Sequence, residues 1–256
     1  MVGQRGIYIK NQQEIATMRE AGHINALALG AVRELIRPGI TTADLDAAAA
    51  EVIRKHGAKP AFLGVPGAYP YPATITVSIN DEMVHGIPGK RKLQSGDIVS
   101  VDCGTIFEGF VGDAAFTAGV GEISPEAQRL IEVTKKSLYI GIDRLLAGNR
   151  VGDVGAAIQE YVESQGLHLT REYTGHGVGR EMWEGPQVPN YGVAGRGLVL
   201  RAGMTIALEP MVLIGTPRTR VLPDQWTVAS ADGSLTAHFE HSVAVTDNGP
   251  LILTKI

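Results

Sequence analysis

The sequence predicts an α+β fold made of two similar halves, in which an antiparallel β-sheet is covered by helices. Each half has two segments with apolar residues at helical spacing, followed by shorter apolar runs typical of strands. The spacing of the glycines that end these segments also repeats, because Gly57 lies 18 residues after Gly39 and Gly166 lies 18 residues after Gly148. A chance resemblance is the alternative, but the repeated order favours pseudo-symmetric halves.

The first pair of helices has clear start and stop signals. Asn11 and Glu14 have the spacing of a capping box, and Pro38-Gly39 ends the apolar periodicity that follows. A second helix is expected to begin near Thr42 and to end at Gly57, since glycine often follows the last helical turn. Two helices therefore precede the first strands.

The second pair begins at Ser124, which is suited to N-capping, with Pro125 at the first helical position. This third helix is expected to run towards Gly148, and a fourth covers 154–162 and ends at Gly166. Strands are predicted over 73–79, 98–103, 110–117, 204–214 and 236–246.

Length and charge favour a globular enzyme that consists of a single domain over residues 1–256. The chain is 44% apolar, and no segment has the composition of a linker. Its net charge of −4 provides no basic field, and the only dense basic cluster is Lys90-Arg91-Lys92. We therefore expect no nucleic-acid partner.

The sequence also predicts a cytoplasmic protein. Residues 1–6 are not followed by the apolar core of a signal peptide, and no apolar run is long enough to span a membrane. The single cysteine, Cys103, excludes an internal disulfide and suits a reducing compartment. Cys103 lies inside an apolar strand pattern, so a buried core residue is favoured over a nucleophile.

Two aspartates are predicted to share one face of a hairpin. Glu108-Gly109 reads as a two-residue turn between the runs that contain Asp102 and Asp113. The tight turn places Asp102 opposite Ala115, and Asp113 projects from the same face because it lies two residues away from Ala115. A bulge would break this parity.

Two carboxylates on an apolar face need a positive partner. An isolated buried carboxylate is strongly destabilised, and these strands contain no Lys or Arg. A divalent metal ion is the simplest partner, since hard cations prefer oxygen ligands. The alternative is an open sheet on which both aspartates face solvent.

Three further residues could complete a metal site. His176 lies between glycines, while Glu209 and Glu240 interrupt apolar strands. A structural histidine and an ion pair with His238 or His241 are the alternatives. Four carboxylates and one imidazole suit two bridged divalent ions, which generate hydroxide near neutral pH. Ser or Cys nucleophilic catalysis is less supported, because the chain has no Gly-x-Ser-x-Gly elbow.

These motifs together resemble the type I methionine aminopeptidases, a family with the pita-bread fold. The resemblance covers nearly the whole chain, and the 33 residues between His176 and Glu209 leave no room for the insertion of type II enzymes. The motifs that carry it are Ser78-Ile-Asn80, His85-Gly-Ile-Pro88, Gly96-Asp-Ile-Val, Asp102, Gly109-Phe, Gly112-Asp113, Gly175-His176-Gly-Val-Gly179, Glu209-Pro-Met, Trp226-Thr and Phe239-Glu240-His.

The resemblance implies an enzyme that removes the initiator methionine from nascent chains whose second residue is small. A hydroxide held between two divalent ions (Co, Mn, Fe, Zn or Ni) would attack the methionine carbonyl. The implied metal ligands are Asp102, Asp113, His176, Glu209 and Glu240. Glu209 would also handle the proton of the attacking water, and His85 would lie near the scissile amide nitrogen.

The resemblance also suggests substrate contacts and partners. The Pro/Gly-rich segment 62–72 is expected to form part of the methionine pocket, with Tyr71 as one wall and Trp226 as a further contact. Nascent polypeptide N-termini near the ribosome would be the partners, without membrane binding, and the chain would be a monomer.

Trp183 departs from the family pattern, which usually has a second histidine at this position. That histidine is thought to hydrogen-bond the substrate carbonyl, whereas an indole can donate one hydrogen bond and cannot accept one. Trp183 either packs beside Met182 or takes a new role in substrate binding. A weakly catalytic peptide-binding relative is therefore kept as an alternative, together with an Xaa-Pro aminopeptidase, which has the same fold.

Overall fold

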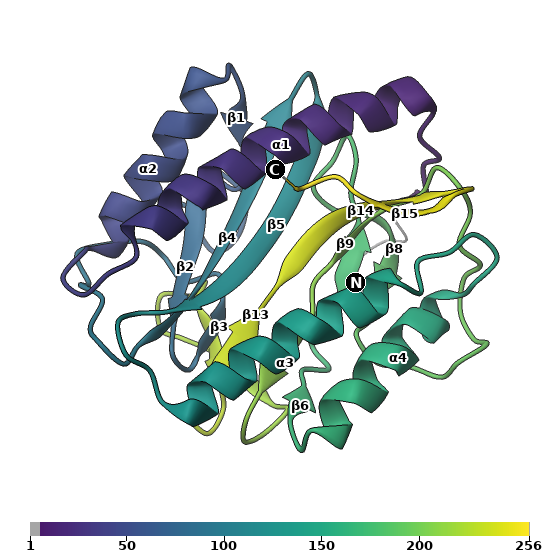
Figure 1. The fold of residues 1–256 in the computed structure, drawn as a ribbon. Helices are drawn as coiled ribbons and strands as arrows, with labels where there is room; N and C mark the ends of the chain where they lie inside the picture. Colours follow the sequence, from purple (N-terminus) through teal and green to yellow (C-terminus); the bar gives the residue numbers. More distant parts are fainter. Residues whose placement is uncertain (1–5, 256) are drawn as a thin grey trace.

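The structure, a computed structural model, describes residues 6–255 and places four helices within that range on a large antiparallel sheet (Figure 1). The helices are α1 (Gln12–Leu35), α2 (Thr42–Lys55), α3 (Pro125–Ile142) and α4 (Val151–Ser164). The predicted caps are confirmed, because Asn11 and Glu14 form a capping box and the Ser124 side chain accepts a hydrogen bond from the Ala127 N–H. The third helix ends at Ile142, short of Gly148, and a turn fills the interval.

The strands form one nine-stranded sheet and two three-stranded sheets. The main path of the large sheet has the order β1-β4-β5-β14-β9-β7-β8, with β2 paired to β4 and β15 to β14. The strands are β1 (Lys59–Pro60), β2 (Ile75–Ile79), β3 (Glu82–Val84), β4 (Ile98–Phe107), β5 (Phe110–Gly119), β6 (His168–Leu169), β7 (Gly175–Gly177), β8 (Glu184–Val188), β9 (Thr205–Leu208), β10 (Met211–Leu213), β11 (Thr219–Val221), β12 (Val228–Ser230), β13 (Thr236–His238), β14 (Glu240–Thr246) and β15 (Gly249–Ile252).

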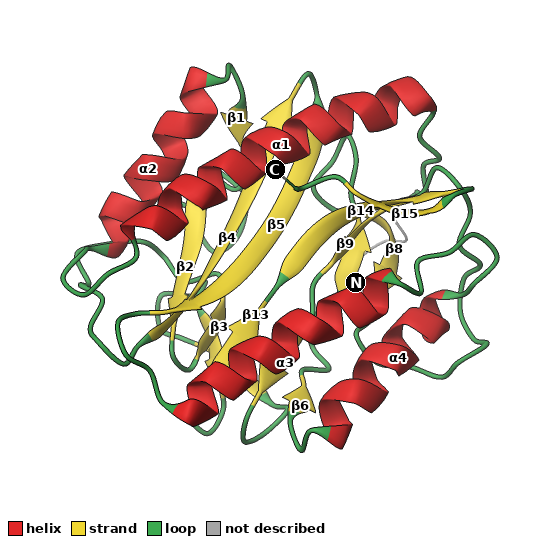
Figure 2. Ribbon diagram, viewed as in Figure 1, coloured by secondary structure: helices red, strands yellow, loops and turns green. Residues whose placement is uncertain are grey.

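The two predicted halves are joined within the large sheet by the pairing of β5 with β14, and β12 of the second half also pairs with β3 of the first. Figure 2 shows α1 and α2 over the strands of the first half and α3 and α4 over those of the second, with all four helices on one side. β5 of the first half pairs with β14 of the second, where Ala115 is opposite Glu240. The sheet is therefore continuous across the seam, and its helix-free face is available for a site.

The contact between α1 and the sheet depends on two facing glycines. A Cβ on Gly112 of β5 would lie 2.6 Å from the backbone nitrogen of Gly22, and a Cβ on Gly22 would lie 2.3 Å from the carbonyl oxygen of Leu253. Real Cβ atoms do not approach backbone this closely, so glycine allows the helix to pack directly on the strands. The helix α1 therefore packs on the face of β5 that is opposite the site.

Two of the predicted long strands are interrupted. The segment 204–214 divides into β9 and β10, and 236–246 divides into β13 and β14, with each member in a different sheet. Pro210 lies at the first break and has no N–H for a ladder hydrogen bond. The Phe239 N–H, at the second break, donates to the Pro210 carbonyl at 3.3 Å. Glu209 and Glu240 thus lie where the chain passes between sheets.

Two smaller expectations concern the membrane and Cys103. Within residues 6–255, no helix combines the length and apolar character needed to cross a bilayer. Cys103 is fully buried in the core, and burial raises the pKa of its thiol. The prediction of a core cysteine is therefore confirmed.

Candidate metal centre

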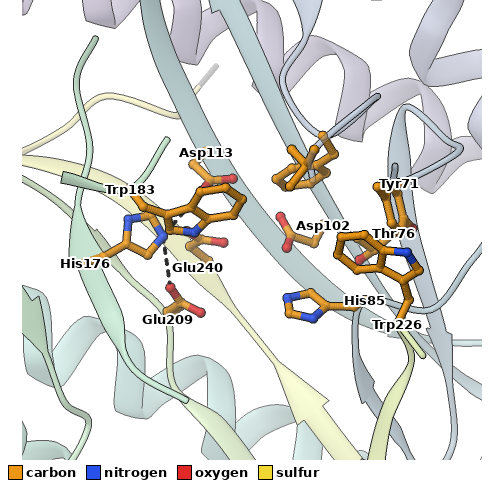
Figure 3. Close-up of a pocket in the computed structure, with 12 residues that line it drawn as sticks. Tyr71, Thr76, His85, Asp102, Asp113, His176, Trp183, Glu209, Trp226 and Glu240 are labelled. Atoms are coloured by element: carbon orange, nitrogen blue, oxygen red, sulfur yellow. Dashed lines mark ion pairs between the residues drawn. The ribbon is translucent and has the colours of Figure 1, made fainter. Parts of the chain in front are cut away.

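The five predicted ligands come from five neighbouring strands of the large sheet. In the order β4-β5-β14-β9-β7, they are Asp102, Asp113, Glu240, Glu209 at the end of β9, and His176. Figure 3 shows their side chains around one pocket, together with those of His85 and Trp183. The structure therefore brings together all five residues that the sequence predicted, from both halves.

The hairpin geometry agrees with the predicted parity. β4 and β5 pair without a register shift, Asp102 lies opposite Ala115, and Ala115 lies opposite Glu240 on its other side. Both turn residues have positive φ, 48° for Glu108 and 77° for Gly109, as a primed two-residue turn requires. The small Ala115 side chain therefore leaves the space between two carboxylates open.

In the second half, His176 lies close to Glu209 and Asp113, and hydrogen bonds with the backbone orient His176 and Glu209. The His176 Nε2 lies 3.4 Å from Glu209 Oε1 and 3.8 Å from Asp113 Oδ2. The His176 Nδ1 lies 2.9 Å from the Gly177 carbonyl, which can only accept, so Nδ1 carries the proton and Nε2 presents its lone pair. The Asn190 amide holds the Glu209 carbonyl at 2.9 Å.

The carboxylates are crowded and underprovided with hydrogen-bond donors. Asp102 Oδ1, Asp113 Oδ1 and Glu240 Oε1 are buried and have no hydrogen-bond partner among the described residues. Burial raises the pKa of Asp113 to about 7, and burial followed by the neighbouring carboxylates raises the pKa of Asp102, Glu209 and Glu240 well above the usual range. A divalent cation would satisfy these oxygens and remove the repulsion.

The donor set fits a metal ion. One ligand atom each from Asp113, His176 and Glu240 lies within 4.8 Å of the other two, a spacing that one ion can bridge. Oxygen ligands with a single imidazole suit several first-row divalent metals. The residues present therefore fit a metal centre, with Asp102 and Glu209 beside this group of three.

An ion pair with histidine does not explain the cluster. His238 Nε2 lies 3.8 Å from Glu209 Oε2 and 4.0 Å from Glu240 Oε2, but it has no hydrogen-bond partner among the described residues. Burial lowers the pKa of His238 to about 3, with a smaller effect of His85. The imidazole is therefore neutral near pH 7 and cannot balance the carboxylates.

A small cavity of about 100 Å³ adjoins the cluster and is walled by aromatic rings. The rings of Tyr71 and Trp226 meet edge to face with centroids 5.1 Å apart. Figure 3 shows both rings near Thr76. The Tyr71 hydroxyl donates to the carbonyls of Gly86 at 2.9 Å and Ile75 at 3.1 Å. Tyr71 thus joins the cavity wall to the turn that carries His85.

His85 enters the pocket from a strained turn. Its φ is +62°, a left-handed conformation that few non-glycine residues adopt and that is common at functional sites. Burial lowers the pKa of His85 to about 4, so its ring is neutral near pH 7. The ring lines both this cavity and a larger neighbouring one.

Trp183 lies at the boundary between the two cavities, and it lines both of them. Its ring centroid is 6.4 Å from that of His176, and the residue is 37% exposed. The adjacent Met182 is buried in a hydrophobic cluster with Phe62 and Tyr71, two residues that also line the small cavity. Trp183 is therefore the more exposed of two neighbours near the same cavity wall.

The sequence analysis gave Thr76 no role, and it named Phe62 and Val65 only as part of the pocket segment 62–72 and His238 only as an ion-pair alternative. Thr76, Phe62 and Val65 line the small cavity, and His238 lines the larger one, which has a volume of about 940 Å³. Thr76 faces Asp102 across the β2–β4 pair, a contact that its position in a strand pattern could have suggested. His238 could be suspected from its apolar surroundings in the sequence.

Comparison with known proteins agrees with this geometry. The model of metallopeptidase family M24 matches residues 16–247. Methionine aminopeptidase from Clostridium perfringens is 49% identical over 98% of this chain and 99% of its own length, and methionine aminopeptidase 1 from Bacillus subtilis is 45% identical over 98% and 100%.

Solved structures show the same relationship. The crystal structure of methionine aminopeptidase from Thermotoga maritima has a TM-score of 0.95 and 48% identity, covering 98% of this chain and 100% of that one. A prolidase from Pyrococcus furiosus has a TM-score of 0.78 at 22% identity, over 97% of this chain and 65% of that one. The prolidase shares the fold, and this identity supports nothing further.

The fold and the carboxylate-histidine cluster define a metal-dependent peptidase with the pita-bread architecture. Within that class, the chain belongs to metallopeptidase family M24. The predicted resemblance to methionine aminopeptidases is confirmed by relatives that are 45–49% identical over nearly the full chain.

Proposed function

We propose that this chain removes the N-terminal methionine from polypeptides, and that residues 1–256 act as a single catalytic domain. The observation that carries the proposal is the small aromatic cavity directly beside five converging metal-ligand side chains (Figure 3). One water needs roughly 10–15 Å³ of cavity volume. A cavity of about 100 Å³ therefore has room for several groups the size of water, which is sufficient for the side chain of methionine.

We assign Asp102, Asp113, His176, Glu209 and Glu240 as ligands of two divalent ions, chosen from Co, Mn, Fe, Zn and Ni. When bound, such ions supply the water activation and carbonyl polarisation that amide hydrolysis requires near neutral pH. The support for the site is the set of buried carboxylate oxygens without hydrogen-bond partners.

The protein's own groups would divide the remaining work. Glu209 would hold a proton of the attacking water, as the resemblance to methionine aminopeptidases implies, and burial and the nearby aspartates raise its pKa, as they do for Glu240. His85 is neutral near pH 7 and can donate one hydrogen bond near the leaving amide nitrogen without adding charge. Tyr71 and Trp226 would hold the methionine side chain by apolar contact.

Trp183 would contact the substrate at the entrance to the methionine cavity. Trp183 is 37% exposed, whereas Met182 is 8% exposed, and Trp183 lines both cavities, which favours this role over packing beside Met182. An indole can donate one hydrogen bond to the substrate but cannot transfer a proton as a histidine can. A weaker stabilisation of the transition state is the expected consequence.

The substrates would be nascent polypeptides whose second residue is small, met near the ribosome by a monomer in the cytoplasm. The relatives of this chain are bacterial methionine aminopeptidases, and the described helices include no membrane span. The two remaining candidates, an Xaa-Pro aminopeptidase and a weakly catalytic peptide-binding relative, differ in what they hydrolyse.

A metal-reconstitution assay separates these candidates. The metal-free protein is supplied with Mn²⁺, Co²⁺ or Fe²⁺ in turn and is tested on a Met-Ala-Ser peptide and on an Xaa-Pro peptide. We expect hydrolysis of the methionyl peptide alone. Preference for the Xaa-Pro peptide would support the first alternative, and metal binding without hydrolysis of either peptide would support the second.

A further inference from the structure

The seam of the large sheet, where β5 of the first half meets β14 of the second, has a very short backbone ladder. Among the described residues, the two strands pair at Ala114 with His241 and at Ala115 with Glu240, whereas β4 and β5 pair along their whole length. Asp113 lies on one side of this seam, and Glu240 lies on the other. The width of the seam therefore sets the distance between proposed metal ligands from the two halves.

Ser242 bridges the two strands just beyond one end of this ladder. It is the residue that would face Asp113 if the pairing of His241 with Ala114 were extended by one position. The Ser242 Oγ accepts a hydrogen bond from the Asp113 N–H at 3.0 Å and donates one to the Asp113 carbonyl at 2.9 Å. Ser242 is fully buried, so the bridge is shielded from solvent. A single hydroxyl thus satisfies both backbone groups of a proposed metal ligand.

Thr117 forms the same kind of bridge beyond the other end of the ladder, and in the opposite direction. It would face His238 if the pairing were extended by two positions. Its Oγ1 donates to the His238 carbonyl and accepts from the His238 N–H, both at 2.9 Å. Because the hydroxyl proton is used on that carbonyl, the Ser100 hydroxyl, 2.8 Å away, is the donor of the bond that it shares with Thr117. Thr117 therefore holds the segment that leads directly into Glu240.

A hydroxyl bridge and a backbone ladder hold strands at different spacings. In a ladder the strands lie about 4.7–4.9 Å apart, whereas a side chain inserted between them lets the backbones diverge and still gives each buried N–H and carbonyl a partner. The ladder of the seam accordingly ends before Ser242 in β14 and before Thr117 in β5. Across the seam, one ligand atom of Asp113 and one of Glu240 lie within 4.8 Å of each other, and Figure 3 shows both side chains at the pocket.

We propose that Ser242 and Thr117 are positioning residues of the metal centre, and that their hydroxyls set the separation of the ligands contributed by the two halves. The inference rests on the proposed metal-dependent function. Neither residue lines the cavities described above, so each acts through the backbone of a neighbour. Removing one hydroxyl leaves two buried backbone groups without a partner and allows the strand that carries the ligand to shift. Loss of such a supporting contact typically weakens metal binding by roughly tenfold to a hundredfold.

Thr42 provides a matched control in another part of the fold. Its hydroxyl makes the same double bridge, donating to the Gly89 carbonyl at 3.0 Å and accepting from the Gly89 N–H at 2.8 Å, and Thr42 is 2% exposed. Thr42 is the first residue of α2, one of the helices that cover the side of the sheet opposite the site (Figure 2). Thr42→Val therefore removes the same two hydrogen bonds at a place that carries no proposed ligand.

The test measures binding of Mn²⁺ to the metal-free protein by titration calorimetry. We expect Ser242→Ala and Thr117→Val each to raise the dissociation constant for Mn²⁺ about tenfold, and Thr42→Val to leave it unchanged. All three variants should lower the unfolding temperature of the metal-free protein, because each leaves buried backbone groups unpaired. Thr117→Ser keeps the hydroxyl and loses only a methyl group, so it should bind Mn²⁺ as the wild type does.

Wild-type affinity in both Ser242→Ala and Thr117→Val, or an equal loss in Thr42→Val, would overturn the positioning role and leave the proposed function intact. If the wild type binds Mn²⁺ but hydrolyses no peptide, the proposed function fails, and the affinities still decide the positioning role. If the wild type binds no Mn²⁺, both fail.

A further variant covers the case in which neither Ser242→Ala nor Thr117→Val folds. Ser242→Cys preserves most of the side-chain volume, and its thiol is a weaker donor and acceptor than a hydroxyl. We expect it to fold and to bind Mn²⁺ severalfold more weakly than the wild type. Unchanged affinity in Ser242→Cys would then overturn the positioning role.

Discussion

The two halves of the protein hold their site residues by different means. In the first half, Asp102 and Asp113 lie inside a hairpin whose two ten-residue strands pair without interruption. In the second half, Glu209 and Glu240 lie at breaks between sheets, and the register of β7 against β8 shifts beside His176. One side of the site is fixed by a backbone ladder, and the other by separate contacts between distant segments.

This difference determines how far a substitution in each half disturbs its neighbours. A ladder cannot move one side chain without moving its neighbours, so the hairpin provides a fixed base for two ligands. The loops of the second half depend on individual contacts, such as the Asn190 amide on the Glu209 carbonyl and Lys10 on Glu184. Such loops tolerate a changed residue, and Trp183 lies on one of them.

The largest effect is expected from a change in the hairpin. Asp113→Asn keeps the shape of the side chain and removes one ligand charge. We therefore expect kcat/KM on a methionyl peptide to fall by about a hundredfold to a thousandfold. The metal-free variant should be more stable than the metal-free wild type, because burial raises the pKa of this carboxyl to about 7 and disfavours its charge. Activity assays and thermal unfolding measure the two effects.

Asp143 is exposed, so Asp143→Asn is a control that makes the same chemical change on a carboxylate in contact with solvent. This control should alter neither quantity. A metal-free Asp113→Asn protein that unfolds at a lower temperature than the wild type would contradict the account of a strained, underprovided carboxylate. It would indicate that the charge is stabilised by contacts within the protein alone.

Stability of the metal-free protein should also depend on pH. A carboxyl group with a raised folded pKa stabilises the fold below its unfolded pKa, and this contribution is lost as pH rises through the folded value, about 7 for Asp113. His85 and His238 have lowered pKa values and act oppositely, but only below their usual 6.5, where the unfolded state takes up protons.

From pH 6.5 upward, the carboxylates therefore dominate, and the unfolding temperature of the metal-free protein should fall. Added Mn²⁺ should restore it, and the increase due to metal should grow with pH, because the ionised ligands bind the cation. Calorimetry with and without metal measures this difference. A metal-free protein that becomes more stable over the same range would rule out the raised pKa values.

Sequence analysis predicted the first half better than the second for the same physical reason. The turn at Glu108-Gly109 and the period of two determine which way Asp102 and Asp113 point, and both signals are local. The break after Glu209 had a local signal in Pro210, but the prediction treated 204–214 as one strand. The break at Phe239 has no comparable residue and depends on its contact with Pro210.

Contacts between distant segments were beyond local reasoning. Lys10 and Glu184 are 174 residues apart, and nothing in either neighbourhood indicates the other. The convergence of His176, Glu209 and Glu240 was predicted from the family resemblance, since each alone fitted a structural role. Their metal-binding roles stay predictions, while their arrangement on adjacent strands follows from the structure.

A smaller effect is expected from the loop that carries Trp183. Trp183→His restores a side chain that can both donate and accept a hydrogen bond, so turnover of a Met-Ala peptide should rise about tenfold. This increase is smaller than the rate effect of a typical oxyanion donor, because metal would contact the same substrate oxygen. Trp183→Phe keeps an aromatic ring without the N–H and serves as the control. Unchanged or lower turnover in a correctly folded Trp183→His protein would show that the indole is not a deficient donor.

The smallest effect is expected from Tyr71, a residue of the first half that lines the small cavity. The variant tests the role of the hydroxyl separately from that of the ring. Tyr71→Phe keeps the aromatic contact with Trp226 but removes the hydrogen bonds to the Gly86 and Ile75 carbonyls. Loss of a neutral hydrogen bond costs about 1 kcal/mol, so kcat should fall about fivefold through looser placement of His85, with KM nearly unchanged.

Tyr69→Phe is the matched control, because the Tyr69 hydroxyl donates to the Asp224 carbonyl at 2.9 Å and Tyr69 is 39% exposed. It should change neither kcat nor KM. A rise in KM with constant kcat in Tyr71→Phe would mean that the hydroxyl shapes the methionine cavity. The wall and the catalytic turn would then be independent, and the first half would depend on its strand ladder alone to align the site.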